Sequence, residues 1–153
     1  MINIDVFSEE KAWSKRLKNK ELFFKKICQA FPKKYKFINK KVSFSVLLSN
    51  DLNIKKLNKN FRNKNKPTDI LSFPISNKIE ISKNDYIGDI IISYNFIDKP
   101  RSQKFKNFKE KLIKIFIHGF LHLQGFNHVK NDDYMKMLRE EEQIYQSVIL
   151  KLN

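Results

Sequence analysis

The three histidines of this chain all lie in one stretch of twelve residues, from Ile117 to His128. His118 and His122 are four residues apart, a spacing that puts two imidazoles on one face of a helix with their Cβ atoms about 5–6 Å apart. Gly125 follows at a point where helices commonly end on a residue of positive φ, and this turn can bring His128 back to the same point. The chain must therefore fold so that one helix end and the turn after it converge.

Three neutral imidazoles around one point suit Zn²⁺, with a fourth coordination position open to water as in catalytic sites. The sequence therefore predicts one zinc ion bound by His118, His122 and His128. The alternative interpretation is three unrelated side chains, one in the core and two at a helix end. The glycine break and the absence of any other histidine favour the metal site. Zinc peptidases carry a glutamate directly after the first histidine as general base, and here that position is Gly119.

The length of 153 residues suits one domain, residues 1–153, with a single sizeable core. Cys28 is the only cysteine, which excludes an internal disulfide and a thiolate zinc site. The N-terminal segment lacks the pattern of a signal peptide, and no apolar run approaches the length of a membrane span. We therefore expect a cytoplasmic protein without a membrane partner.

The formal net charge of +15 points to an acidic polymer as partner. Residues 1–66 carry 18 basic and 5 acidic residues, so most of the excess lies in the first half of the chain. Nearly all of the basic residues are lysine, which is also what an AT-rich genome produces by composition alone. The uneven distribution favours RNA as the partner, with compositional bias as the alternative.

Alternation of apolar and polar residues predicts strands in four places. These are residues 2–7, 42–48, 70–73 and 87–93. Residues 75–87 are expected to form a loop or hairpin connection. Helical spacing predicts a long helix that begins after Ser8 as N-cap and ends at Pro32, and a short helix over residues 54–61.

The two histidines of the i, i+4 pair fall on a predicted helix that is apolar around much of its circumference and is therefore expected to be buried. Asn107 and Glu110 resemble a capping box at its start. Residues 94–106 before it are expected to be either an irregular link or a short helix. Asn131 is expected to cap a last helix, whose acidic cluster Glu140–Glu142 is interpreted as a solvated face.

Three blocks of the sequence together resemble one known family. The block HGFLHLQGFNH is similar to the H-G-x-L-H-L-x-G-Y-D-H signature of the bacterial YbeY endoribonucleases. LNKNFRNKNKPTDILSFP and GDIIIS resemble two further segments of that family, in the same order and at similar spacing. With the flanking elements, the resemblance covers nearly the whole chain.

This resemblance implies a single α+β domain with a four-stranded mixed sheet packed by helices. It implies a zinc-dependent, single-strand-specific endoribonuclease that acts on the small ribosomal subunit in 16S rRNA 3′-end maturation and in ribosome quality control. Arg62 matches the arginine of the family's Y-R pair, and its guanidinium fork suits a phosphate, with a surface salt bridge as the alternative role. Lys64 and Lys66 are expected either to follow an RNA backbone or to be ordinary solvated lysines.

Two positions depart from the family pattern, because Asn127 and Asn65 stand where the family has aspartate. We expect Asn127 to support the third histidine ligand through a contact outside the metal coordination. An amide can accept a hydrogen bond there, but it orients and charge-stabilises an imidazole less well than a carboxylate. No general base is identifiable, although Asp69 and Asp89 are near in motif order. Two alternatives to the nuclease remain, a non-catalytic RNA- or ribosome-associated module with a structural metal, and a zinc peptidase.

Overall fold

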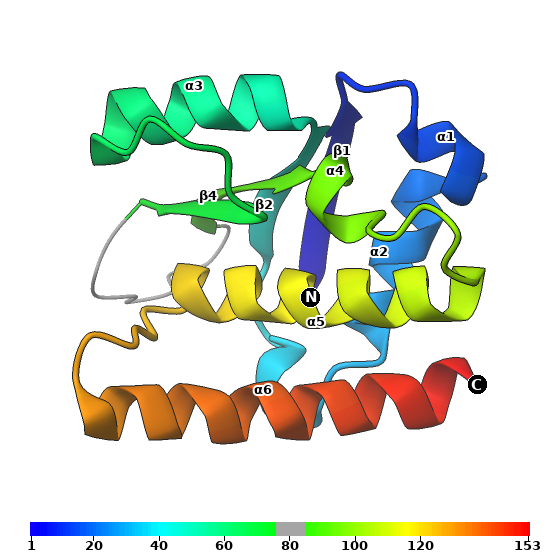
Figure 1. Cartoon of the computed structure of the whole chain (residues 1–153). Helices are drawn as coiled ribbons and strands as arrows, with labels where there is room; N and C mark the ends of the chain where they lie inside the picture. Colours follow the sequence, from blue (N-terminus) through cyan, green and yellow to red (C-terminus); the bar gives the residue numbers. More distant parts are fainter. Residues whose placement is uncertain (76–84) are drawn as a thin grey trace.

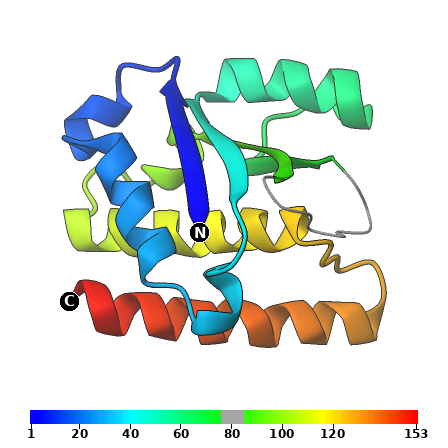
Figure 2. The same ribbon diagram turned by 180° about the vertical axis from the view of Figure 1, so that it is seen from behind.

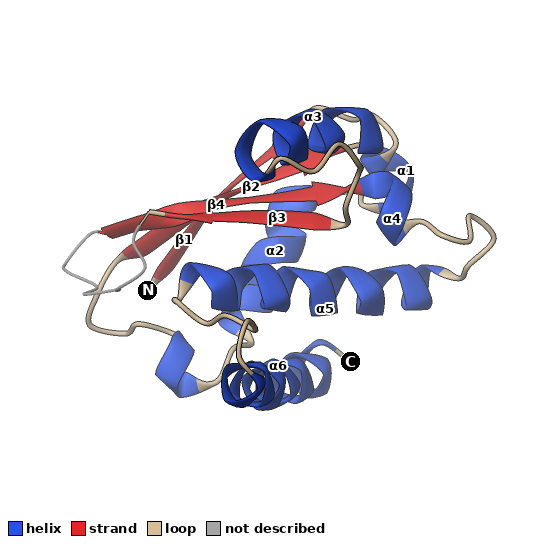
Figure 3. Ribbon diagram, turned by 60° about the vertical axis from the view of Figure 1, so that its left-hand side comes forward, coloured by secondary structure: helices blue, strands red, loops and turns tan. Residues whose placement is uncertain are grey.

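Four strands form one mixed sheet that lies between helices on both of its faces (Figures 1 and 3). The computed structural model describes residues 1–75 and 85–153. The strands are β1 (Ile2–Ser8), β2 (Val42–Ser49), β3 (Ile70–Pro74) and β4 (Asp85–Ser93). Their order in the sheet is β1-β2-β4-β3, with β1, β2 and β4 parallel and β3 antiparallel to β4. The predicted α+β class with a four-stranded mixed sheet is confirmed.

One face of the sheet carries the main core. Because side chains alternate along a strand, Val42, Phe44 and Val46 of β2 all point to the same face, where they are fully buried. The helices α2 (Lys20–Gln29) and α5 (Phe105–Leu123) cover this face, and α2 runs beside β1 in the view from behind (Figure 2).

The helix α6 (Asn131–Leu152) packs on the side of α5 that faces away from the sheet (Figure 3). The helix α5 is therefore enclosed between the sheet and α6, which explains the apolar circumference predicted for it. Its buried residues are Phe108, Leu112, Ile113, Phe116, Ile117, Gly119, Phe120, Leu121 and Leu123.

The opposite face of the sheet is covered by α3 (Asp51–Arg62). Ile54 of α3 packs there with Leu71 and Ile91 in a second, smaller apolar cluster. The side chain of Asn50 accepts a hydrogen bond from the first turn of this helix, and Asn63 ends it in the left-handed conformation, with φ of 55°. Arg62 is consequently the last residue of the helix.

The long helix expected between Ser8 and Pro32 is wrong. Ser8 is the last residue of β1, and two helices follow it, α1 (Trp13–Arg16) and α2. Leu17 is extended, and the side chain of Asn19 accepts a hydrogen bond of 2.9 Å from the backbone N–H of Leu22. Pairing with β2 keeps Ser8 in the sheet, and the local cap at Asn19 starts the second helix afresh.

The expected capping box at Asn107 is also wrong, because α5 begins at Phe105 and no side chain caps it. Asn131 is the first residue of α6 and does not act as its cap. Residues 94–106 combine both expectations, with the short helix α4 (Tyr94–Ile97) and then an irregular link that contains a cis Lys99–Pro100 peptide bond, while the last two residues of the range already belong to α5.

The expected connection over residues 75–87 falls mostly on 76–84, outside the described residues, while its last three residues belong to β4. The remaining element is the short 3-10 helix η1 (Lys33–Tyr35). Within the described ranges, none of the helices is both long enough and apolar enough to cross a membrane.

Candidate metal centre

The structure brings the three histidines together. His118 and His122 lie one turn apart near the end of α5, and Gly125, with φ of 90°, turns the chain so that His128 returns to them. The ring centroids are 4.6, 5.6 and 5.1 Å apart for the three pairs, and one nitrogen of each ring lies within 4.8 Å of the other two. The three-histidine group is therefore positioned to bind a metal ion, as the sequence predicted.

Hydrogen bonds at the outer ring nitrogens decide which nitrogens of His118 and His122 are free to bind a metal ion. Nδ1 of His118 lies 2.6 Å from a carboxylate oxygen of Glu141, and Nδ1 of His122 lies 3.0 Å from the carbonyl oxygen of Phe126. Because both partners are acceptors, each Nδ1 carries the proton and each Nε2 keeps its lone pair. The two Nε2 atoms face each other at 3.0 Å.

Two lone pairs that face each other at this distance repel, and a shared cation removes the repulsion. Burial, and then the electrostatic effect of the neighbouring His118, lower the pKa of His122 to about 4, so His122 is neutral at pH 7. A neutral imidazole is the form that ligates a metal. The donor set therefore fits a divalent cation that accepts nitrogen ligands.

Glu141 is the functional residue that the sequence analysis missed. It was interpreted as part of a solvated acidic face together with Glu140 and Glu142, but its side chain is only 27% exposed and bonds His118. Glu140 is also engaged, because it accepts hydrogen bonds from Lys34 and Tyr35. The solvated-face interpretation is therefore wrong for two of the three residues.

A signal for Glu141 was present in the spacing of α6. Met137, Ile144 and Val148 are buried, and Glu141 occupies the position between them on the same helical stripe, four residues after Met137 and three before Ile144. A carboxylate on the apolar stripe of a helix faces the interior and needs a partner there. The partner, His118, lies 23 residues away on another helix.

Arg62 lies beside the histidines, although it comes from α3 on the other face of the sheet. Its Nη2 donates to the backbone oxygen of Ser72 at 3.3 Å, so the guanidinium lies against β3. Arg62, Ser72, His122, Phe126 and Asn127 all line one hollow of about 360 Å³. The arginine and one histidine thus face a common space, and that space is large enough for a phosphate group.

Lys64 and Lys66 are exposed on the segment after α3. Asn58 holds this segment, because its side chain donates to the backbone oxygen of Lys66 at 2.8 Å and its backbone oxygen accepts from the N–H of Lys64 at 3.2 Å. In the part of the chain that the structure describes, no hydrogen bond or ion pair joins either lysine side chain to the histidines. Their position next to Arg62 is compatible with the predicted contact to a polyanion.

Asn127 lines the hollow, but within residues 1–75 and 85–153 it makes no hydrogen bond to a histidine ring. The two carboxylates considered as bases point elsewhere. The side chain of Asp69 accepts from the backbone N–H of Ile70 at 2.8 Å. Asp89 accepts from Ser45 at 2.5 Å on the face of the sheet away from α5, so neither of the two faces the histidines.

Gly119 shows why this site differs from a zinc peptidase. A Cβ at this position would lie 2.6 Å from Cδ1 of Ile70 and 3.1 Å from Oγ of Ser72. The residue after the first histidine therefore faces β3 at close contact and not the open side of the metal centre. A glutamate cannot act as general base from this position.

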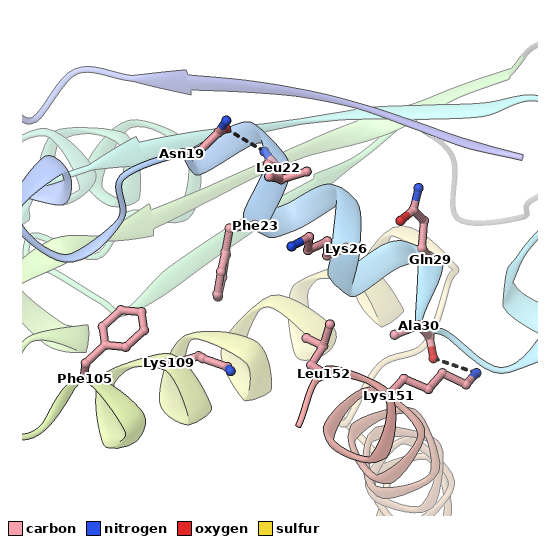
Figure 4. Close-up of a pocket in the computed structure, with 10 residues that line it drawn as sticks. All are labelled: Asn19, Leu22, Phe23, Lys26, Gln29, Ala30, Phe105, Lys109, Lys151 and Leu152. Carbon is pink, nitrogen blue, oxygen red and sulfur yellow. Dashed lines mark hydrogen bonds between the residues drawn. The ribbon is translucent and has the colours of Figure 1, made fainter.

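A larger hollow of about 610 Å³ lies elsewhere, between α2, the start of α5 and the end of α6 (Figure 4). Its wall includes Phe23, Lys26, Phe105, Lys109 and Lys151, with no histidine and no carboxylate among the lining residues. It therefore offers neither an imidazole nor a carboxylate to a transition metal. The candidate site is therefore the histidine group and the smaller hollow beside it.

Comparisons with known proteins show which family the chain is similar to. The family model described as Endoribonuclease YbeY matches residues 5–149. A protein of that name from Pelagibacter ubique is 55% identical over 152 residues, 99% of each chain, and one from Buchnera aphidicola is 39% identical over 132 residues, 86% of this chain and 83% of the relative. The solution structure of TM1509 from Thermotoga maritima is similar with a TM-score of 0.59 and 27% identity, covering 95% of this chain and 89% of that one. The range matched by the family model includes the three histidines.

Proposed function

The chain belongs to the YbeY endoribonuclease family, and from this premise we propose that it is a zinc-dependent endoribonuclease that cleaves single-stranded RNA. The observation that carries the proposal is the convergence of three histidine nitrogens, together with an arginine that lines the same hollow as His122. His118, His122 and His128 would hold one Zn²⁺, because three imidazoles with no further protein ligand leave a catalytic position open. Among the described residues, these three histidines are the group of side chains that could hold a metal ion.

The protein side chains supply positioning and charge. When bound, Zn²⁺ lowers the pKa of a coordinated water towards ~7 and polarises a phosphoryl oxygen. The guanidinium of Arg62 offers paired N–H donors to the non-bridging oxygens of the phosphate that enters the hollow. Glu141 and the carbonyl of Phe126 keep the protons of His118 and His122 on Nδ1, so that each Nε2 points to the shared centre.

The surrounding chain fits an RNA substrate. Lys64 and Lys66 would follow the RNA backbone next to Arg62, and the net charge of +15 favours a polyanion. Asn127, which lines the hollow, would influence the zinc affinity or the rate of cleavage. By family resemblance, the substrate is the 3′ region of 16S rRNA in the small ribosomal subunit, and the role is rRNA maturation and ribosome quality control. Residues 1–153 would act as one catalytic domain.

Cleavage of an end-labelled single-stranded RNA by the purified protein tests this function. We expect a chelator to abolish cleavage and added Zn²⁺ to restore it. We expect His118→Ala to remove activity and Arg62→Ala to lower it by about 10²–10³-fold, the usual cost of losing one preorganised donor to developing charge. Arg101→Ala is the matched control, because it removes an arginine that does not line the hollow.

The outcomes separate the three functions. Binding of RNA without cleavage, at full metal occupancy, would identify a non-catalytic module with a structural metal. Cleavage of casein but not RNA would identify a peptidase, against which Gly119 already argues. Equal activity of Arg62→Ala and Arg101→Ala would remove Arg62 from the site.

A further inference from the structure

Phe61, the residue before Arg62, is a large apolar side chain that the fold leaves exposed. Its exposed fraction is 67%, although it occupies the sheet-facing stripe of α3, seven residues after the buried Ile54. The ring packs against the ring of Phe73, with centroids 5.3 Å apart and planes inclined by 63°. An edge-to-face contact of this kind holds a ring in place while leaving much of its surface accessible.

Phe61 and Arg62 are anchored on consecutive residues of β3. The ring of Phe61 contacts Phe73, and the guanidinium of Arg62 donates to the backbone oxygen of Ser72. Neighbouring Cα atoms are about 3.8 Å apart, so the two anchors are adjacent along the strand. β3 lies at the edge of the sheet, and no other described strand pairs with its outer side. A chain that crosses this edge can therefore contact the guanidinium and the ring in succession.

The guanidinium of Arg62 lies at the edge itself, because it bonds the backbone oxygen of Ser72, and it lines the same hollow as His122. The pleat of β3 separates the side chains of Ser72 and Phe73 onto opposite faces of the sheet. The hydroxyl of Ser72 donates to the backbone oxygen of Gly119 at 3.3 Å on the α5 side, whereas Phe73 packs with the α3-side cluster. The histidines lie on the α5 side, and the ring of Phe61 lies on the α3 side. A phosphate held at Arg62 thus leaves a neighbouring nucleotide free to turn over the edge and meet the ring.

Charge identifies what covers this exposed ring. Between residues 55 and 66, which cover the last two turns of α3 and the residues directly after it, the charged residues are all basic: Lys55, Lys56, Lys59, Arg62, Lys64 and Lys66. An apolar ring among cations suits a ligand that has a planar apolar face and a negative backbone. Nucleic acid strands have both, because each base offers a π face and each phosphate a charge.

We propose that Phe61 is a nucleobase platform, on which an unpaired base next to the scissile phosphate stacks while Arg62 binds that phosphate. This inference rests on the proposed nuclease function and adds the origin of its selectivity for single strands. A base within a duplex has both faces covered by its neighbours and must leave the stack before it can reach a protein ring. An unpaired base reaches Phe61 without that cost, so the platform favours single-stranded RNA.

The test combines a protein change with an RNA change. Phe61→Leu keeps an apolar side chain but removes the aromatic face, and Phe61→Tyr retains it. Leu52→Ala is the matched control, because Leu52 is 65% exposed at the other end of the same helix. The substrates are one single-stranded oligonucleotide, its duplex, and a series in which each nucleotide near the cleavage position is made abasic in turn.

We expect Phe61→Leu to lower kcat/KM on single-stranded RNA by about tenfold, mainly through KM, because stacking contributes to binding. Phe61→Tyr should restore this loss, and Leu52→Ala should match the unchanged protein. Cleavage of the duplex should hardly change, so the preference for single strands should fall. At one position of the RNA, removal of the base should lower kcat/KM of the unchanged protein by the same tenfold. The same abasic substrate should leave kcat/KM of Phe61→Leu unchanged.

Three results would overturn the platform. The first is full activity of Phe61→Leu on single-stranded RNA. The second is an equal fall in the kcat/KM of Phe61→Leu at every abasic position. The third is that Phe61→Leu weakens only the binding of a protein partner and leaves RNA cleavage unchanged. Thermal unfolding of the variants excludes a folding defect as the cause. If the unchanged protein does not cleave RNA, the nuclease proposal itself fails. RNA affinity measured by fluorescence anisotropy on Phe61→Leu and Leu52→Ala then still decides whether the ring binds a base.

Discussion

The contact between Glu141 and His118 gives the sharpest prediction, because it joins a metal-centre histidine to a residue on a different helix. Glu141→Gln removes the negative charge at the outer side of His118 but keeps the shape and an oxygen that can accept the proton of Nδ1. The change therefore isolates the effect of charge on the basicity of the ring. Glu142→Gln is the control, since Glu142 is exposed and accepts a hydrogen bond from Gln146.

The magnitude follows from the distance and the exposure of this pair. Loss of a carboxylate behind a histidine ligand typically lowers metal affinity by about 10–100-fold. The contact is short, at 2.6 Å, which favours a large effect, but the two side chains are 32% and 27% exposed, and water screens charges at that exposure. We therefore expect the lower end, about tenfold weaker zinc binding, or about 1.4 kcal/mol.

Competition between the protein and a chromophoric zinc chelator measures this affinity directly and needs no activity assay. Glu142→Gln should bind zinc as the unchanged protein does. Thermal unfolding of the metal-free variants should show similar midpoints, which separates a weaker metal site from a weaker fold. Equal zinc affinities for Glu141→Gln and Glu142→Gln would refute the reasoning, because the charge at Nδ1 would then have no influence on the metal.

Four further predictions follow from the same structure. Because burial lowers the pKa of His122 to about 4, the unfolded state binds more protons than the folded state between that value and about 6.5, so the free energy of unfolding of the metal-free protein should fall as pH is lowered through this window. Urea titrations should show this slope, and it should be smaller in His122→Asn. Gly119→Ala should lower the free energy of unfolding by about 1–3 kcal/mol, because its Cβ would lie 2.6 Å from Cδ1 of Ile70. Adding Ile70→Val, which removes that Cδ1 atom, should recover part of the loss. An unchanged unfolding midpoint for Gly119→Ala would contradict the close contact. Asn127→Asp should tighten zinc by up to about tenfold if this residue supports the site, whereas equal affinities would leave it only a role in the turn. RNA affinity should fall steeply as salt rises, because lysine–phosphate contacts release counterions, and a flat salt dependence would make the positive charge a compositional bias.

The features that depend on local spacing were predictable from the sequence. The i, i+4 spacing of His118 and His122 places both rings on one helical face whatever the helix packs against, and the glycine that follows allows the turn. The four strands were predictable because alternation of apolar and polar residues reports directly on a sheet with a buried face. These inferences need no knowledge of any distant contact.

Element boundaries were less predictable where two local signals competed. Ser8 is a good helix cap, but in the structure it extends β1, whose last residues pair with β2. Helical spacing of apolar residues continues from Leu17 to Phe24, yet the Asn19 side chain accepts a hydrogen bond from the first turn of α2 and so permits a break there. A capping residue favours a helix start without excluding a strand end, and only tertiary pairing decides between the two.

The sequence by itself determined which residues could hold a metal, and the tertiary structure decided which residues surround it. Glu141 reaches His118 across 23 residues because α6 packs along α5, and Arg62 reaches the hollow beside His122 because α3 ends over the edge strand β3. Helix periodicity fixes the face on which a side chain lies, but not the neighbour that the face meets. That neighbour depends on the order of the strands and the layering of the helices, which arise only when the whole core is packed.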